Sequence, residues 1–192
     1  MTFRVKNRTM VNCHSPEYDF LQSKNMKSFF KSPIKILLPI VIIGLVIGLA
    51  LSLKQKPQAP NVMFNTIDGK QLSMQSLQGK MVLVNFWATD CPGCIEEMPA
   101  LIETYKTYRD KNFELIAVAM PHDTLSQVIN YSKSNDLPFP VIHDASGTIA
   151  EQFNDVRLTP TAFIIDKKGH IIGKSIGTLN FTALHQLLDA NQ

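Results

Sequence analysis

The chain has 192 residues, enough for one ordinary domain with accessory segments and too few for two full domains. Its formal net charge of +3 is unevenly spread: residues 1–35 hold seven basic and two acidic residues, whereas residues 54–192 hold twelve basic and fourteen acidic ones. The larger part is therefore slightly acidic, which argues against nucleic-acid binding, since that function needs a basic patch.

Residues 1–33 show neither a helical nor a strand period and are predicted to form a largely disordered cytoplasmic segment. Met26 opens a short basic stretch followed by an apolar one, which is typical of a leader. Translation from Met26 instead of Met1 therefore stays open as an alternative.

An uncharged run extends from Ile36 to Leu53. With its edge residues it predicts a transmembrane helix over residues 34–53, because about 20 apolar residues span a bilayer core of about 30 Å. Basic residues are in excess before the run, which predicts an N-terminus in the cytoplasm and a periplasmic or extracytoplasmic location for everything after Leu53. A cleaved signal peptide is the alternative, but Ala50-Leu51-Ser52 is a poor cleavage site, so a retained single-pass anchor is favoured.

Residues 54–60 include two prolines and are predicted to be a linker, followed by one folded domain over residues 61–192. Alternation of apolar runs and helical patterns predicts βαβ units in a mixed sheet flanked by helices, an α/β fold. Asp68-Gly69 and Lys168-Gly169 predict two hairpins. Strands are expected at 62–66, 70–72, 81–87, 113–119, 139–143, 161–166 and 170–176, and helices after residue 91 and at 124–135, 149–153 and 181–190.

Cys91-Pro92-Gly93-Cys94 lies where the buried strand 81–87 passes into a helix. The positive end of a helix dipole stabilises a thiolate, so Cys91 is predicted to be the nucleophile and Cys94 to resolve the mixed disulfide that Cys91 forms. Half of a zinc site and a purely structural disulfide are the competing interpretations. The first lacks further ligands in the exported part, and the second gains little from so short a loop.

The segment from Asn85 to Cys94, with Glu96-Glu97-Met98-Pro99 after it and Thr159-Pro160-Thr161 later, resembles the thioredoxin superfamily. More narrowly, about residues 58–190 resemble the membrane-anchored TlpA/ResA/CcmG-type disulfide reductases of bacteria. The resemblance implies a thioredoxin-like fold with an N-terminal β-hairpin extension and an extra βαβ segment at residues 115–143. It also implies a cis Thr159–Pro160 bond facing the two cysteines, with the backbone of Thr159 pairing with substrate.

Two further positions belong to the predicted site. Glu97 lies one helical turn after Cys94, where an acid in the resembling reductases helps to handle the proton on the resolving thiol. Trp87 is placed with Thr159 and Pro160 at the substrate-binding side of the site, with packing beneath the cysteines and a fluorescence report of redox state as its expected parts.

The chain also departs from the family pattern at two positions. Asp90 precedes the first cysteine where many relatives carry Trp, and its charge should raise the pKa of the Cys91 thiol and favour a reductant. Asn85 stands where cytoplasmic thioredoxins have a buried Asp, which makes Glu97 the expected proton-handling group.

The sequence therefore predicts an enzyme, a thiol–disulfide oxidoreductase without cofactor or bound metal, that reduces disulfides of exported proteins. The resemblance suggests cytochrome c maturation or copper-site assembly clients and a membrane thiol electron donor of the CcdA/DsbD type. A disulfide-donating oxidase is one alternative. A non-enzymatic copper chaperone is another, in which Met98, Met120 and His122 would hold Cu(I) with the two thiolates.

Overall fold

A computed structural model of the chain describes residues 32–52 and 56–192. The chain divides into two units, residues 1–54 and 55–192. The first unit contains helix α1 (Ser32–Ser52), of which the side chains of residues 37–49 are described. Within the described part of the chain, no helix meets the length and apolarity that crossing a membrane requires. The predicted start at Met26 and most of the predicted N-terminal segment, residues 1–31, lie outside the described residues.

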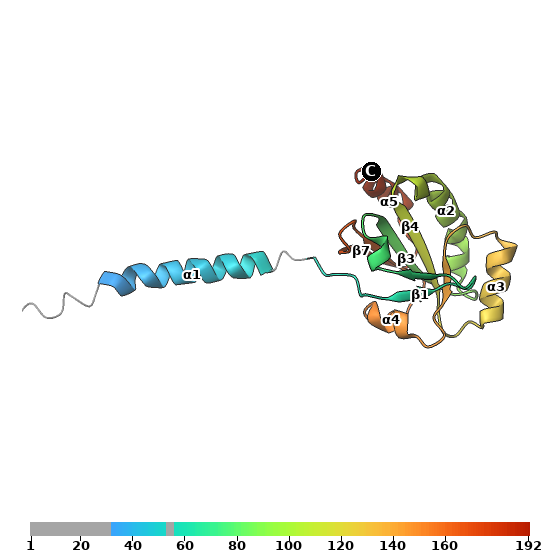
Figure 1. Ribbon diagram of the computed structural model, residues 1–192, viewed down its shortest axis with the longest axis horizontal. Helices are drawn as coiled ribbons and strands as arrows, with labels where there is room; N and C mark the ends of the chain where they lie inside the picture. The colour runs from blue at the N-terminus through green and yellow to red at the C-terminus, as the bar shows by residue number, and fades with distance from the viewer. Residues whose placement is uncertain (1–31, 53–55) are drawn as a thin grey trace, which may run out of the picture. The chain divides into compact units, whose positions relative to one another are not determined.

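The second unit is built on a five-stranded sheet in the order β5-β4-β3-β6-β7. The paired strands β3 and β4 lie side by side in Figure 1. The strands β3 (Met81–Trp87), β4 (Phe113–Ala119) and β5 (Val141–His143) are parallel, and β6 (Thr161–Ile165) and β7 (Ile171–Ile176) add an antiparallel hairpin. The predicted mixed sheet and the extra βαβ segment are confirmed. All seven residues of β3 are buried, because it is the central strand and both of its faces are covered.

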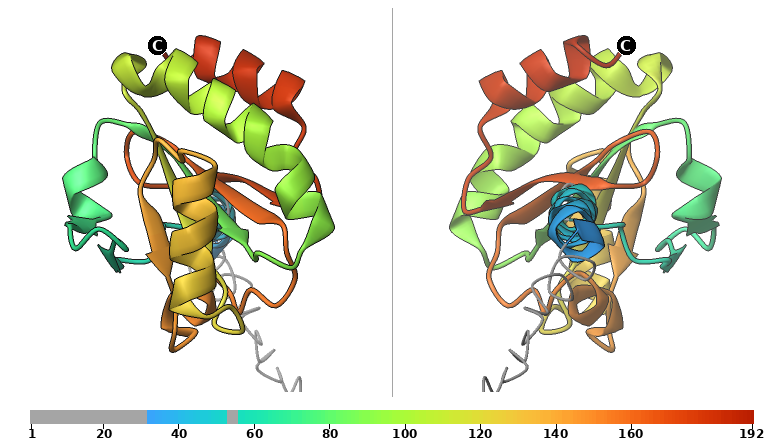
Figure 2. Two further views of the ribbon diagram at one scale, coloured as in Figure 1. Left: turned by 90° about the vertical axis from the view of Figure 1, so that its right-hand side faces the viewer. Right: turned by 90° about the vertical axis from the view of Figure 1, so that its left-hand side faces the viewer.

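Helices and the N-terminal hairpin cover the two faces of this sheet. Helices α2 (Pro92–Tyr108), α3 (Leu125–Ser134) and α5 (Phe181–Asp189) pack on one face, and α2 and α5 lie side by side there (Figure 2). Helix α4 (Thr148–Gln152) and the hairpin β1 (Met63–Asn65)–β2 (Gln71–Ser73) supply the other face. Short 3-10 turns occur at Gln75–Leu77 and Arg109–Lys111.

The segment that leads into the hairpin is tied to the sheet. Ala59 donates its N–H to the carbonyl of Gly169 at 2.8 Å, and Gln58 bridges to His170. Beyond strand β1, Ile67 donates its N–H to the carbonyl of Val141 in β5 at 2.9 Å. The folded unit therefore takes in residues 57–60, which were expected to form the end of the linker.

The predicted strands and helices of the second unit are all present, and their ends differ for local reasons. Strand β5 starts at Val141 and not at residue 139, because Pro140 offers no N–H to the ladder. Helix α3 starts at Leu125 because Thr124 is its N-cap, in a capping box closed by Gln127.

Candidate active site

Cys91 and Cys94 form a disulfide at the junction of β3 and α2. Cys91 is the N-cap residue of α2 and Pro92 its first residue, as expected for a proline with no N–H to satisfy. The Sγ of Cys91 accepts the backbone N–H of Cys94 at 3.3 Å. After reduction the same donor would stabilise a thiolate at Cys91, which agrees with its predicted role as nucleophile.

The two sulfurs differ in access. Cys91 is half-buried, whereas Cys94 is fully buried in the cluster beneath α2. A protein substrate can therefore reach only Cys91. A Cys91 thiolate would attack a substrate disulfide, forming one S–S bond and breaking another, and the released substrate thiolate would take a proton. Attack by a Cys94 thiolate on Cys91 would then free the second substrate sulfur and restore the disulfide seen here, so two electrons pass to the substrate.

Pro160 lies beside the disulfide loop, and its bond to Thr159 is cis, as the resemblance implied. A Cβ built on Gly93 would lie 3.6 Å from Cδ of Pro160, so the loop and the proline are in contact range. Among the described residues, neither the N–H nor the carbonyl of Thr159 has a hydrogen-bond partner. Free backbone groups next to the accessible sulfur are the arrangement that an extended peptide needs to pair with the protein.

Glu97 is buried, with 3% of its surface exposed, on the inner side of α2. Its Oε2 accepts the backbone N–H of Leu179 at 3.2 Å, and its Oε1 lies 3.4 Å from Nδ2 of Asn85. Burial raises the pKa of the Glu97 carboxyl, and these two hydrogen bonds offset part of the rise. The carboxyl one turn from Cys94 is thus placed to exchange a proton nearer neutral pH than an exposed one.

The partners of Glu97 explain why the sequence revealed only part of this arrangement. Asn85 was noted as a departure from cytoplasmic thioredoxins, but nothing in the sequence connects it with Glu97. Leu179 follows 82 positions after Glu97 and precedes α5, so only the fold brings its N–H to the carboxyl. The Oδ1 of Asn85 is buried and has no partner among the described residues. It could accept a hydrogen bond from a protonated Glu97 if the amide turned over.

Trp87 corrects one expectation. It is fully buried and packs against Tyr131, with ring centroids 5.1 Å apart. Its side chain offers no exposed surface to a protein substrate, so the structure places it in the core beneath the cysteines and not on the substrate-binding side. It belongs to the same buried cluster as Cys94, which suits a fluorescence reporter of the disulfide.

The soft-ligand set that copper would need is not brought together. Met98 packs with Cys94 beneath α2, whereas Met120 belongs to the core on the opposite face of the sheet. Both methionines are buried, at 1% and 6% exposure. Residues on opposite faces of a sheet cannot share one ion, so the Met98–Met120–His122 site is not supported.

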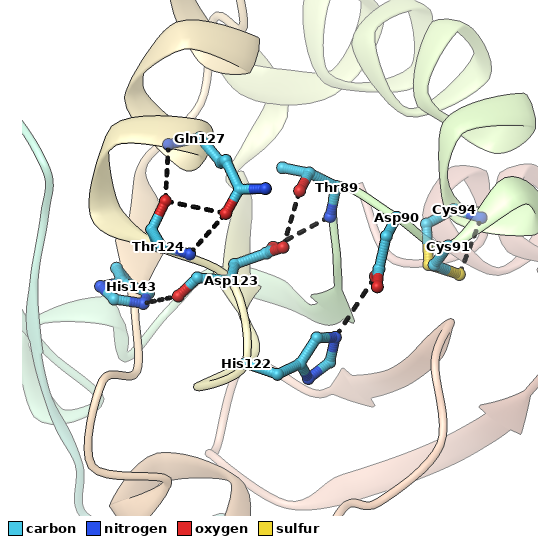
Figure 3. A network of polar contacts seen from close by, with 9 residues as sticks. All are labelled: Thr89, Asp90, Cys91, Cys94, His122, Asp123, Thr124, Gln127 and His143. Atoms are coloured by element: carbon cyan, nitrogen blue, oxygen red, sulfur yellow. Dashed lines mark hydrogen bonds and ion pairs between the residues drawn. A yellow bond between two sulfur atoms is a disulfide. The ribbon is translucent and has the colours of Figure 1, made fainter.

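A polar network next to Cys91 was not predicted from the sequence (Figure 3). Asp90 is exposed, and its carboxylate points toward His122, with Oδ1 3.4 Å from Nε2. The buried Asp123 accepts hydrogen bonds from both the N–H and the hydroxyl of Thr89. His122 and Asp123 lie in the loop between β4 and α3, where no motif marks them.

The strand order, the disulfide at the start of α2 and the cis proline beside it define a thioredoxin-like thiol–disulfide oxidoreductase. Residues 56–174 match the model of the AhpC/TSA family, and the chain belongs to this family. The chain is an enzyme of the thiol–disulfide oxidoreductase class, as its relatives show.

The regions of similarity to these relatives cover most of both chains. Thiol-disulfide oxidoreductase ResA of Bacillus thuringiensis subsp. konkukian is 36% identical over 131 residues, which cover 68% of this chain and 75% of that protein. Thioredoxin-like protein YneN of Bacillus subtilis is 37% identical over 139 residues, covering 71% and 80%. Among solved structures, a thioredoxin-family thiol:disulfide interchange protein from Chlorobium tepidum TLS is 30% identical with a TM-score of 0.66, covering 71% of this chain and 97% of its own.

Proposed function

We propose that this enzyme is a reductase of disulfides in exported proteins and is anchored in the cytoplasmic membrane with its catalytic domain outside. Electrons would come from a membrane thiol carrier of the CcdA/DsbD type. Its clients would be of the cytochrome c maturation or copper-site assembly kind.

One observation supports this direction of electron flow: the carboxylate of Asp90 directly precedes Cys91. Its negative charge disfavours the Cys91 thiolate, and a disulfide whose reduced form is less stabilised is a weaker oxidant. Glu97, one turn after Cys94, is buried with a raised pKa and is therefore counted as a proton-handling group and not as a negative charge. The protein is therefore expected to give electrons to substrates.

The reduction potential tests this direction. The full chain in detergent would be equilibrated with dithiothreitol or glutathione buffers and followed by Trp87 fluorescence and by trapping of free thiols. A potential near about −270 mV would support a reductase, whereas a value near about −120 mV would overturn it in favour of the disulfide-donating alternative.

The anchoring part of the proposal rests on the uncharged run from Ile36 to Leu53, which overlaps α1, and on the excess of basic residues before it. The described large apolar side chains of α1, from Leu37 to Leu49, are half or more exposed. Fractionation of cells that express the full chain should leave it in the membrane after alkaline extraction. A matched Val41→Lys, Val46→Lys variant should be released, and release of the unaltered chain would contradict the anchor.

A further inference from the structure

The loop that carries Cys91 is held against the loop between β4 and α3. Thr89 donates its N–H and its hydroxyl to the carboxylate of Asp123, at 2.9 and 2.6 Å. Asp123 is only 5% exposed, and its carbonyl oxygen lies 2.8 Å from Nε2 of His143. Because Thr89 is two residues before Cys91, these contacts fix the second loop relative to the nucleophile (Figure 3).

His122 lies near two carboxylates at this junction. Its Nε2 is 3.4 Å from Oδ1 of Asp90, and one side-chain atom from each of Asp90, His122 and Asp123 lies within 4.8 Å of the other two. The side chains of His122 and Asp90 are 53% and 73% exposed, so solvent protons reach both. A protonated imidazole in this position would face the negative charge of Asp90 directly, with that of Asp123 nearby.

The charged groups around His122 leave it as the cation of this cluster. Asp90 faces it from the β3–α2 loop and Asp123 from its own loop, while His143 contacts the carbonyl of Asp123 and not its carboxylate. Among the described residues, no lysine or arginine forms an ion pair with either carboxylate. Both Asp123 oxygens are already engaged by Thr89, so the exposed charge left for His122 to balance is that of Asp90.

We propose that His122 is a positioning residue for thiol–disulfide exchange: its imidazolium pairs with Asp90, cancels that charge beside Cys91, and thereby raises the fraction of Cys91 that is thiolate in acid above the fraction that Asp90 alone would allow. His122 touches no reacting atom and acts only through Asp90. The inference rests on the thiol–disulfide oxidoreductase activity of the chain and is independent of the direction in which electrons flow.

The expected size follows from electrostatics. A unit charge about 8 Å from a thiolate changes the ratio of thiolate to thiol about two- to sixfold at an effective dielectric constant of about 40–80. An imidazole is positively charged in acid and neutral in alkaline solution. The charge contribution of His122 should therefore be larger at the acid end of the measured pH range than at the alkaline end.

The test is the alkylation rate of the reduced full chain by iodoacetamide in detergent, measured from pH 5 to 9. Cys13 is replaced by Ser in every variant, so that only the active-site thiols can react. The Cys91 thiolate displaces iodide in this reaction, and the buried Cys94 is protected. His122→Gln should react about two- to sixfold more slowly than the unaltered chain near pH 5.5 and equally fast near pH 8. His122→Lys carries a positive charge at every pH measured. It should react as fast as the unaltered chain near pH 5.5 and faster than the unaltered chain near pH 8.

Two further variants separate this role from a merely structural one. In an Asp90→Asn background, His122→Gln should have a smaller effect, because the carboxylate that holds the exposed imidazole beside the Cys91 loop is gone. His170→Gln is the matched control: His170 forms a similar pair with Asp166, also at 3.4 Å, in the turn between β6 and β7, and its loss should change nothing.

Three results would overturn the proposal. These are an equal rate ratio between His122→Gln and the unaltered chain at every pH, additive effects of the Asp90 and His122 changes, or an effect that disappears when a chelator is added. The last result would mean that a metal ion, and not the imidazolium, balances the carboxylates. Because alkylation needs no client and no electron donor, the outcome is separate from that of the reductase proposal.

Discussion

The two sulfurs of the active-site disulfide lie in opposite surroundings, and each has its own carboxyl group. Cys91 is partly exposed and follows the solvent-exposed Asp90, whereas Cys94 is fully buried on the same helix as the buried Glu97. Water screens the charge of Asp90, so its effect on the pKa of the Cys91 thiol is small and depends on whether His122 is charged. Burial instead makes the charged form of Glu97 costly, so that group is suited to holding a proton. The difference in solvation therefore gives the carboxyl groups of Asp90 and Glu97 different chemical roles.

Replacing the cysteines one at a time gives the largest effect. Cys91→Ser should lower disulfide exchange by about a thousandfold or more, because no accessible thiol remains at the active site. Cys94→Ser should still attack substrate but should accumulate a mixed disulfide, since nothing can resolve it. Non-reducing gel electrophoresis with a model disulfide protein distinguishes the two. A mixed disulfide formed through Cys94 in the Cys91→Ser variant would contradict the difference in access.

Removing the buried carboxyl should come next in size. Glu97→Gln should slow the resolving step by about 10- to 100-fold, since general acid–base catalysis contributes about 10²–10⁴-fold where it operates. The pH profile of exchange should also lose one titration. The matched control is Glu96→Gln, which changes the exposed neighbour on the same helix. Equal pH profiles for the Glu97 variant and the unaltered chain would exclude a proton-handling role.

The same variant should alter stability in a pH-dependent way. The folded-state pKa of Glu97 is raised by burial, so the folded chain holds a proton that the unfolded chain releases above about pH 4.3. That contribution to the free energy of unfolding is complete below the unfolded pKa and is lost as pH rises through the folded pKa, at about 1.4 kcal/mol for each pH unit of the window. Glu97→Gln lacks this loss, and its amide can donate to the unpaired Oδ1 of Asn85.

Denaturant titrations at pH 4 and pH 8 check the sign. The free energy of unfolding of Glu97→Gln minus that of the unaltered chain should be larger at pH 8 than at pH 4. A difference that stays constant with pH, or that grows toward acid, would show that the carboxyl is not held with a raised pKa.

The hydrogen bonds from Thr89 to Asp123, which hold the Cys91 loop, should contribute more to the free energy of unfolding than the exposed Asp90–His122 pair does. Asp123→Ala leaves the N–H and hydroxyl of Thr89 without their acceptor, which should cost about 1–3 kcal/mol of unfolding free energy. Asp110→Ala is the control, because that carboxylate is exposed and pairs weakly with Arg109 at 3.7 Å. Similar urea midpoints for the two variants would mean that the Thr89–Asp123 hydrogen bonds do not stabilise the fold.

The smallest effect is expected at Asp90. Asp90→Asn should raise the alkylation rate of Cys91 about two- to sixfold near pH 8, where no imidazolium opposes the carboxylate, and by less near pH 5.5. An increase that rivals the loss in Glu97→Gln would mean that the exposed and buried carboxyls do not differ as their solvation implies.

The sequence predicted most of this fold because the signals were local. The apolar run at β3, the turn pairs at Asp68-Gly69 and Lys168-Gly169, and the strand-to-helix position of Cys91 each depend on neighbouring residues alone. Less was predicted where long-range packing decides. The burial of Trp87 beyond the reach of substrate and the separation of Met98 from Met120 follow from the faces of the sheet on which they fall, and the sequence pattern did not specify these faces.

By itself, the sequence determined that this protein carries a dithiol at a helix N-terminus in a thioredoxin-like α/β domain, because a CxxC motif between a buried strand and a helix is readable in one stretch of chain. Only the tertiary structure decided the surroundings of the two sulfurs. The Leu179 N–H on Glu97 and the His122 imidazole beside Asp90 come from segments distant in sequence. Solvation and electrostatic contacts depend on which segments meet in space, and these surroundings set how the two cysteines react.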